Sequence, residues 1–91
     1  MHCLLYLNKS DASIKFGLFT IIISSGSKSG SYTIDNGDII SAIPTNITIS
    51  GAGIKPNITS IIIYSKTITI TINTQQLAAT TNIYCNLFYL K

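Results

Sequence analysis

The segment 67–73 reads Thr-Ile-Thr-Ile-Thr-Ile-Asn, and this strict alternation is the feature that most limits what the chain can fold into. In a β-strand, alternation places every isoleucine on one face and every polar residue on the other, whereas a helix would scatter the isoleucines around its surface. Only the segment 74–80 contains consecutive helix formers, and it is too short for more than about one helical turn. We therefore expect an all-β protein in which 74–80 is a loop that crosses between two sheets.

Alternation and turn residues together predict eight short strands, at 3–7, 18–24, 31–34, 39–43, 46–50, 58–64, 67–73 and 82–90. Between them lie Gly, Pro, Asn, Asp and Ser, and the pair Asn36-Gly37 predicts a type I′ hairpin turn because both residues tolerate positive φ. Short strands with frequent turns are typical of β-sandwiches, or of a small sheet closed on itself. We expect a small antiparallel β-sandwich of about seven or eight strands, with residues 1–91 forming a single domain.

The composition indicates a surface that water solvates poorly. Charged residues make up 10% of the chain and hydrophobic residues 46%, with a mean hydropathy of +0.43. Such a chain either lies in a membrane or is covered by other subunits. No run of about 18 apolar residues predicts a transmembrane helix, so we expect no membrane span. We expect a homo-oligomer or a complex with other proteins of the same assembly.

The chain carries little catalytic chemistry. Its acidic residues are Asp11, Asp35 and Asp38, and its only imidazole is His2, which has no carboxylate nearby in sequence to position it. Asp35, Asn36 and Asp38 resemble a turn stabilised by local hydrogen bonds more than a calcium site. The six lysines are scattered and arginine is absent, which argues against nucleic-acid binding. We expect no enzymatic activity, metal or cofactor.

Cys3 and Cys85 lie in the first and last predicted strands. We expect the strand at 3–7 to pair with 82–90 or with a neighbouring subunit. If those strands pair, a Cys3–Cys85 disulfide would close a long loop and stabilise the fold by about 4 kcal/mol. Two buried free thiols are favoured, because small disulfide-dependent domains usually carry more cysteines.

The hairpin formed by 58–64 and 67–73 supplies a candidate subunit interface. A loop of even length at Ser65-Lys66 predicts the cross-strand pairs Ile63–Ile68, Ile61–Ile70 and Thr59–Ile72 on the core face. The opposite face of the hairpin has apolar side chains along one strand, which water would solvate poorly, and polar side chains along the other, which a core would not accept. It contains the candidate interface residues Ile58, Ile62 and Tyr64.

The chain from Ser31 onward resembles a known class of β-sandwich module. The residues that carry the resemblance are Ile40-Ser41-Ala42-Ile43-Pro44, the alternating strand at 46–50, the hairpin at 61–73 and the closing segment Asn82-Ile83-Tyr84-Cys85-Asn86-Leu87-Phe88-Tyr89-Leu90. In this pattern the chain is similar to the small distal, H-type-lectin-like domains of phage tail fibres.

The resemblance implies a non-enzymatic virion structural or attachment module, either a capsid decoration or a tail-fibre-like component, with a host glycan as a partner. It transfers no functional residue. The alternative is a free-standing carbohydrate-binding module, which would need an exposed cluster of aromatic and amide side chains at one end of the sandwich.

Overall fold

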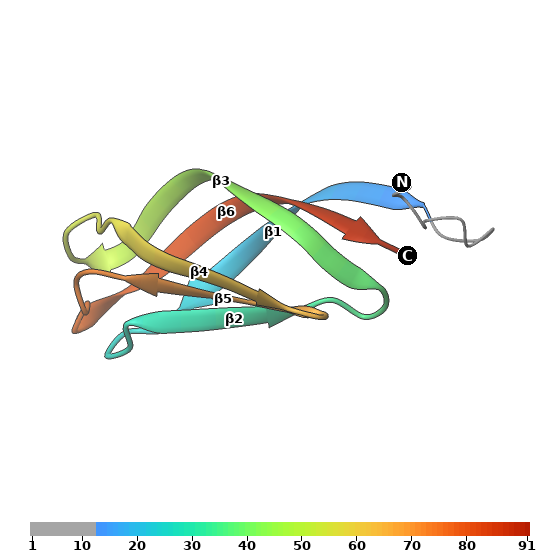
Figure 1. Ribbon diagram of the computed structural model, residues 1–91. Coiled ribbons are helices and arrows are strands. Elements are labelled where there is room, and N and C mark those ends of the chain that lie inside the picture. The colour runs from blue at the N-terminus through green and yellow to red at the C-terminus, as the bar shows by residue number, and fades with distance from the viewer. Residues whose placement is uncertain (1–12) are drawn as a thin grey trace.

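The computed structural model describes residues 13–91, and within them every regular element is a β-strand (Figure 1). The strands are β1 (Ile14–Ile23), β2 (Ser29–Thr33), β3 (Asp38–Ala52), β4 (Ile58–Tyr64), β5 (Thr67–Ile72) and β6 (Ala78–Leu90). They form two antiparallel three-stranded sheets in the orders β1-β6-β3 and β2-β5-β4. The predicted class, a small antiparallel β-sandwich, is confirmed.

The core lies between the two sheets and consists mainly of isoleucine. Along β5 the isoleucines are buried and the threonines face outward, as the alternation predicts. β6 follows the same rule over residues 79–88, where its inward residues are buried and its outward residues are only partly buried. The fully buried side chains are Ile21, Ile23, Ile68, Ile70, Ile72, Thr81, Ile83, Cys85 and Leu87.

The two strands predicted at 39–43 and 46–50 are one continuous strand, β3. Its pairing with β6 shifts register between Ile39 and Ser41 and again between Pro44 and Asn46. Proline cannot donate a ladder hydrogen bond, and β3 lies at the edge of its sheet, where such an interruption is tolerated. The proline therefore bends the strand without ending it.

The predicted hairpin at Asn36-Gly37 is wrong. Gly37 has φ +94°, as a turn requires, but the strands on either side belong to different sheets and do not pair with each other. A Cβ on residue 37 would overlap the carbonyl oxygen of Leu90, so this turn lies against the end of β6. The connection from β5 to β6 does cross between sheets, as predicted, but it ends at Leu77, because residues 78–80 belong to β6.

The β4–β5 hairpin has the predicted register near its turn and a shift farther away. Ile63 pairs with Ile68 and Ile61 with Ile70, but an irregularity between Ile58 and Ser60 places Ile58, not Thr59, opposite Ile72. Ile58 consequently packs against the core. Its predicted position on the outer face is therefore wrong.

The central position of β6 decides the predicted pairing of the segment 3–7. That segment and Cys3 lie outside the described residues. β6 pairs with β1 along one edge and with β3 along the other, from Thr81 to Leu90 on both sides. Both edges of 82–90 are therefore paired within the described residues, and the alternative that 3–7 pairs with a neighbouring subunit stays a prediction.

Candidate functional site

Two surface features stand out on the described part of the chain, and the first is an apolar face on the outside of the β1-β6-β3 sheet. Its side chains are Ile14, Phe16 and Leu18 on β1, Phe88 on β6, and Ile40 and Ile43 on β3. Phe16 is 60% and Leu18 65% exposed. The Phe16 and Phe88 rings pack together with centroids 4.9 Å apart.

The pairing register brings the residues of the apolar face together across three strands. Phe16 lies opposite Phe88, which in turn pairs with β3 at Ser41, next to the extra residue Ile40. β1 and β6 place no charged residue on this face. Farther along the same sheet the surface becomes polar, where Asn82 donates a hydrogen bond of 3.0 Å to Ser50.

Sequence reasoning missed the apolar face because it began the strand that corresponds to β1 at residue 18. The signal was present in the apolar residues Ile14, Phe16 and Leu18 at alternate positions, which is the period of one strand face. An apolar strand face predicted without its neighbours is assigned to the core by default. Only the burial of Ile21 and Ile23, on the other face of β1, shows that this face points away from the core.

The predicted interface on the opposite sheet is smaller. Ile62 is 60% and Tyr64 82% exposed on the outer face of β4. Beside them β2 and β5 present hydroxyl groups, with Ser31 bonded to Thr69 at 2.8 Å and Thr33 bonded to Thr67 at 2.9 Å. This face therefore mixes two exposed apolar side chains with a ladder of hydroxyl pairs.

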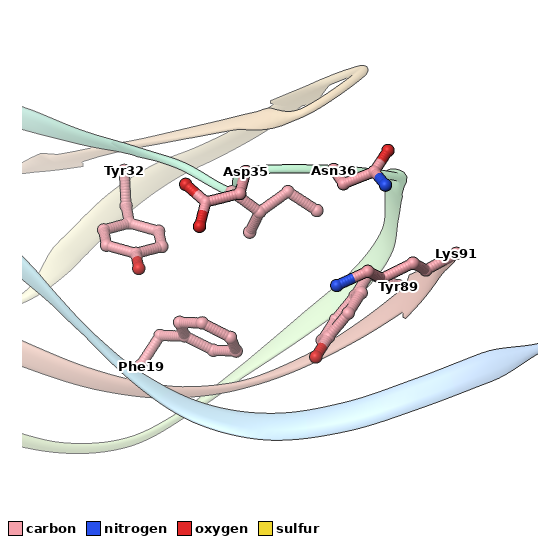
Figure 2. Close-up of a pocket in the computed structure, with 7 residues that line it drawn as sticks. Phe19, Tyr32, Asp35, Asn36, Tyr89 and Lys91 are labelled. Carbon is pink, nitrogen blue, oxygen red and sulfur yellow. The ribbon is translucent and has the colours of Figure 1, made fainter.

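The second feature is a pocket between the two sheets, at the end where β6 terminates (Figure 2). It has a volume of about 120 Å³, and we call it the aromatic pocket. It is lined by Phe19, Tyr32, Ile34, Asp35, Asn36, Tyr89 and Lys91. The Phe19 ring is 5.3 Å from that of Tyr32 and 6.0 Å from that of Tyr89, measured between centroids.

The walls of the aromatic pocket come from both sheets. Figure 2 shows Tyr32 and Asp35, from β2 and the turn after it, across the opening from Phe19 and Tyr89, from β1 and β6. The Lys91 amine extends over Tyr89, and the Asn36 amide lies at the rim.

Backbone hydrogen bonds fix the segments that carry these side chains. The turn after β2 is held at both ends, because Ile34 N donates to Lys66 O at 2.9 Å and Ile39 N donates to Ser65 O at 2.8 Å. Lys91 and Ser13 exchange two backbone hydrogen bonds, of 3.0 and 3.2 Å. The pocket is thus preformed, which lowers the entropy lost when a ligand binds.

The other candidate residues named in the sequence analysis either lie away from the pocket or already form hydrogen bonds within the protein. Asp38 accepts a hydrogen bond of 3.0 Å from the Ser65 hydroxyl. Cys85 is a free thiol in the core, and burial raises its pKa. Within residues 13–91 no cluster of three or more His, Cys, Asp or Glu side chains is arranged to hold a metal ion. His2, like Cys3, lies outside the described residues.

Among residues 13–91 there is no helix of the length and apolar character needed to cross a membrane. Comparisons of the chain with protein-family models, with curated proteins and with solved structures find no match.

Proposed function

We propose that this chain is a non-enzymatic virion structural or attachment module, a capsid decoration or tail-fibre-like component, that acts by packing into a symmetric assembly. The observation that carries the proposal is the apolar face. Large exposed apolar patches on soluble domains usually mark contact surfaces. Burying one side chain such as Leu18 or Phe16 contributes about 1.5–3 kcal/mol.

A second copy of this chain is the partner that fits the apolar face best. The chain carries a net charge of +3, so most of its surface repels a copy, but β1 and β6 bring no charge to this face. Two copies related by a two-fold axis would bury the same patch on each. The described residues measure 49 × 21 × 18 Å, so the broad side is large enough for the roughly 800 Å² per partner of a standard interface.

Sedimentation of the full chain tests this proposal. We expect a discrete oligomer, and we expect Leu18→Lys to convert it to a folded monomer because a desolvated ammonium opposes association. Ser27→Lys is the control, since Ser27 is exposed in the loop between β1 and β2, away from the face. A native chain that sediments as a monomer, or a Leu18→Lys variant that still assembles, would contradict the proposal.

The virion location depends on the resemblance to phage tail-fibre domains, and mass spectrometry of purified virus particles tests it. Detection of the chain at a fixed ratio to the major capsid protein is the expected result. Its absence from intact particles would contradict the location.

A free-standing carbohydrate-binding module is the second candidate function, and the aromatic pocket is the observation that favours it. The pocket lies at one end of the sandwich and combines the aromatic rings of Phe19, Tyr32 and Tyr89 with the Asn36 amide. This is the kind of cluster that such a module needs.

A further inference from the structure

We infer that the aromatic pocket binds the ring of one neutral hexopyranose. This inference deepens the carbohydrate-binding candidate function, on which it rests, by naming the site and the class of sugar. It is argued from the charges, the shape and the rigidity of the pocket.

The charges at the pocket select a neutral ligand. The rim carries one carboxylate, Asp35, and one ammonium, Lys91. A cation is attracted by the Asp35 carboxylate but repelled by the Lys91 ammonium, and the reverse holds for an anion, so the pair gives no net attraction to a charged ligand. A neutral molecule rich in hydroxyl groups satisfies both, because a hydroxyl donates to a carboxylate and accepts from an ammonium.

The polar side chains of the pocket are available to a ligand. Within residues 13–91 the side chains of Asp35, Asn36 and Lys91 make no hydrogen bond or ion pair with protein atoms, in contrast to Asp38, which is bonded to Ser65. A polyhydroxylated ligand would therefore form hydrogen bonds here without breaking any that these side chains make with residues 13–91. Asp35 therefore differs from Asp38, the first residue of β3, in having its carboxylate free of hydrogen bonds to residues 13–91.

The shape of the pocket fits a single ring. Phe19, Tyr32 and Tyr89 surround the opening with apolar ring surface, against which the C–H side of a pyranose can pack. The volume of about 120 Å³ is below that of a cavity of about 150 Å³ known to accept benzene, which is a smaller molecule than a hexopyranose, so the pocket covers only one side of the sugar ring. Further sugars of an oligosaccharide would therefore extend into solvent beyond Lys91 and Asn36.

The small size of the pocket predicts weak binding at each site. We expect dissociation constants of about 1–10 mM for a free monosaccharide. Several copies held in one assembly would bind a glycan-coated surface much more tightly than one copy, because the later contacts form within the same complex. Weak single sites are thus compatible with an attachment role.

Nuclear magnetic resonance titration of the isotopically labelled full chain tests the inference. The probes are glucose, galactose, mannose and their N-acetylated 2-amino derivatives, with glucuronate and glucosamine as charged comparisons. We expect at least one neutral sugar to shift the signals of Tyr32, Asp35 and Tyr89. We also expect the anionic and cationic sugars to bind more weakly than that neutral sugar.

Two variants and one matched control locate the site. Asp35→Asn removes the carboxylate from an exposed turn position, and Tyr32→Ala removes one ring at the rim. Each is expected to weaken binding by about tenfold. Tyr64→Ala is the control, because it removes an equally large ring that is exposed outside the pocket. A dispersed amide spectrum verifies that each variant is folded.

The possible outcomes distinguish sugar binding at the aromatic pocket from carbohydrate binding elsewhere on the chain. Shifts that are confined to the pocket, and lost in Asp35→Asn and Tyr32→Ala but not in Tyr64→Ala, support the inference. Sugar-induced shifts elsewhere on the chain would preserve the carbohydrate-binding candidate and overturn the pocket as its site. No shift with any probe would overturn both, and sedimentation of the same samples would still report on assembly.

Discussion

Gly30 on β2 lies against the main-chain carbonyl of Ile22 on β1, so close that a Cβ on residue 30 would overlap the carbonyl oxygen. The two strands belong to different sheets, and this contact joins the sheets along one edge of the sandwich. A side chain at position 30 would also press on Ile23 in the core. The edge can close only around glycine.

Gly30→Ala should therefore destabilise the fold by about 1–3 kcal/mol, the usual cost of overpacking a well-filled contact. Chemical denaturation followed by circular dichroism measures this loss. Ser29→Ala is the control, since Ser29 is an exposed neighbour on the same strand, and it should change stability by less than about 0.5 kcal/mol. Equal stability of the two variants would contradict the close approach of β2 to β1.

Gln76 ties the loop after β5 to the loop after β3. It is buried, its Nε2 donates to Ile54 O at 2.5 Å, and its Oε1 accepts from Ile54 N at 3.1 Å. Gln76→Glu keeps the acceptor but loses the donor and buries a carboxylate, so we expect a loss of about 1–3 kcal/mol in the free energy of unfolding. Gln75→Glu is the matched control, because Gln75 donates a similar bond to Gly26 O but is exposed, and its effect should be clearly smaller. Similar losses in both variants would show that the burial of Gln76 does not matter.

Thr81 places a hydroxyl in the apolar core. The side chain is fully buried, and its Oγ1 has no hydrogen-bond partner among the described residues. Valine has the same shape without the polar atom, so Thr81→Val should raise the melting temperature and stabilise the fold by about 1 kcal/mol. Thr80→Val, at a half-buried position on the outer face, should have little effect. A Thr81→Val protein less stable than the native chain would show that the Thr81 hydroxyl has a hydrogen-bond partner outside the described residues.

The two faces of the β4–β5 hairpin should respond differently to a charge. Ile62 is exposed on the outer face and Ile70 is fully buried between the sheets. We expect Ile62→Lys to leave the domain folded because its ammonium stays in water, and Ile70→Lys to unfold the domain because its ammonium would be buried without a partner. Circular dichroism on both variants distinguishes the two effects. The prediction fails if Ile62→Lys unfolds the chain or if Ile70→Lys leaves it folded.

Cys85 should make stability depend on pH in the alkaline range. Burial raises the pKa of its thiol in the native state because desolvation disfavours the thiolate. The unfolded chain, with an ordinary thiol pKa of about 8.5, loses this proton at a lower pH than the native chain does. Below the pKa of the unfolded thiol, Cys85 therefore does not lower the free energy of unfolding. As the pH rises from the pKa of the unfolded thiol to that of the native thiol, the free energy of unfolding falls.

Denaturation between about pH 8 and 9.5 measures this effect, because the range brackets the ordinary thiol pKa of about 8.5. Both proteins should carry Cys3→Ser, so that only one thiol contributes. We expect the chain with Cys85 to lose stability over this range more steeply than the chain with Cys85→Ala. Equal slopes would show that the native and unfolded thiols titrate alike.

The sequence by itself determined the strands and most of their faces. In β5 the alternation of threonine and isoleucine has a period of two, and this period is a local property of an extended chain, so it is readable without any partner. The pairs Ile63–Ile68 and Ile61–Ile70 follow in turn from the short connection at Ser65-Lys66. Short-range geometry was sufficient for these features.

Only the tertiary structure decided which strands became neighbours. Asn36-Gly37 has the residues of a hairpin turn, yet β3 pairs with β6 because their long ladder and shared core outweigh the local preference of two residues. The irregularity after Ile58 likewise follows from packing across the sandwich and leaves no local pattern. The aromatic pocket combines Phe19, Tyr32 and Tyr89 from three distant parts of the chain. No local sequence pattern predicts that these three rings lie close together, because they meet only when the two sheets pack face to face.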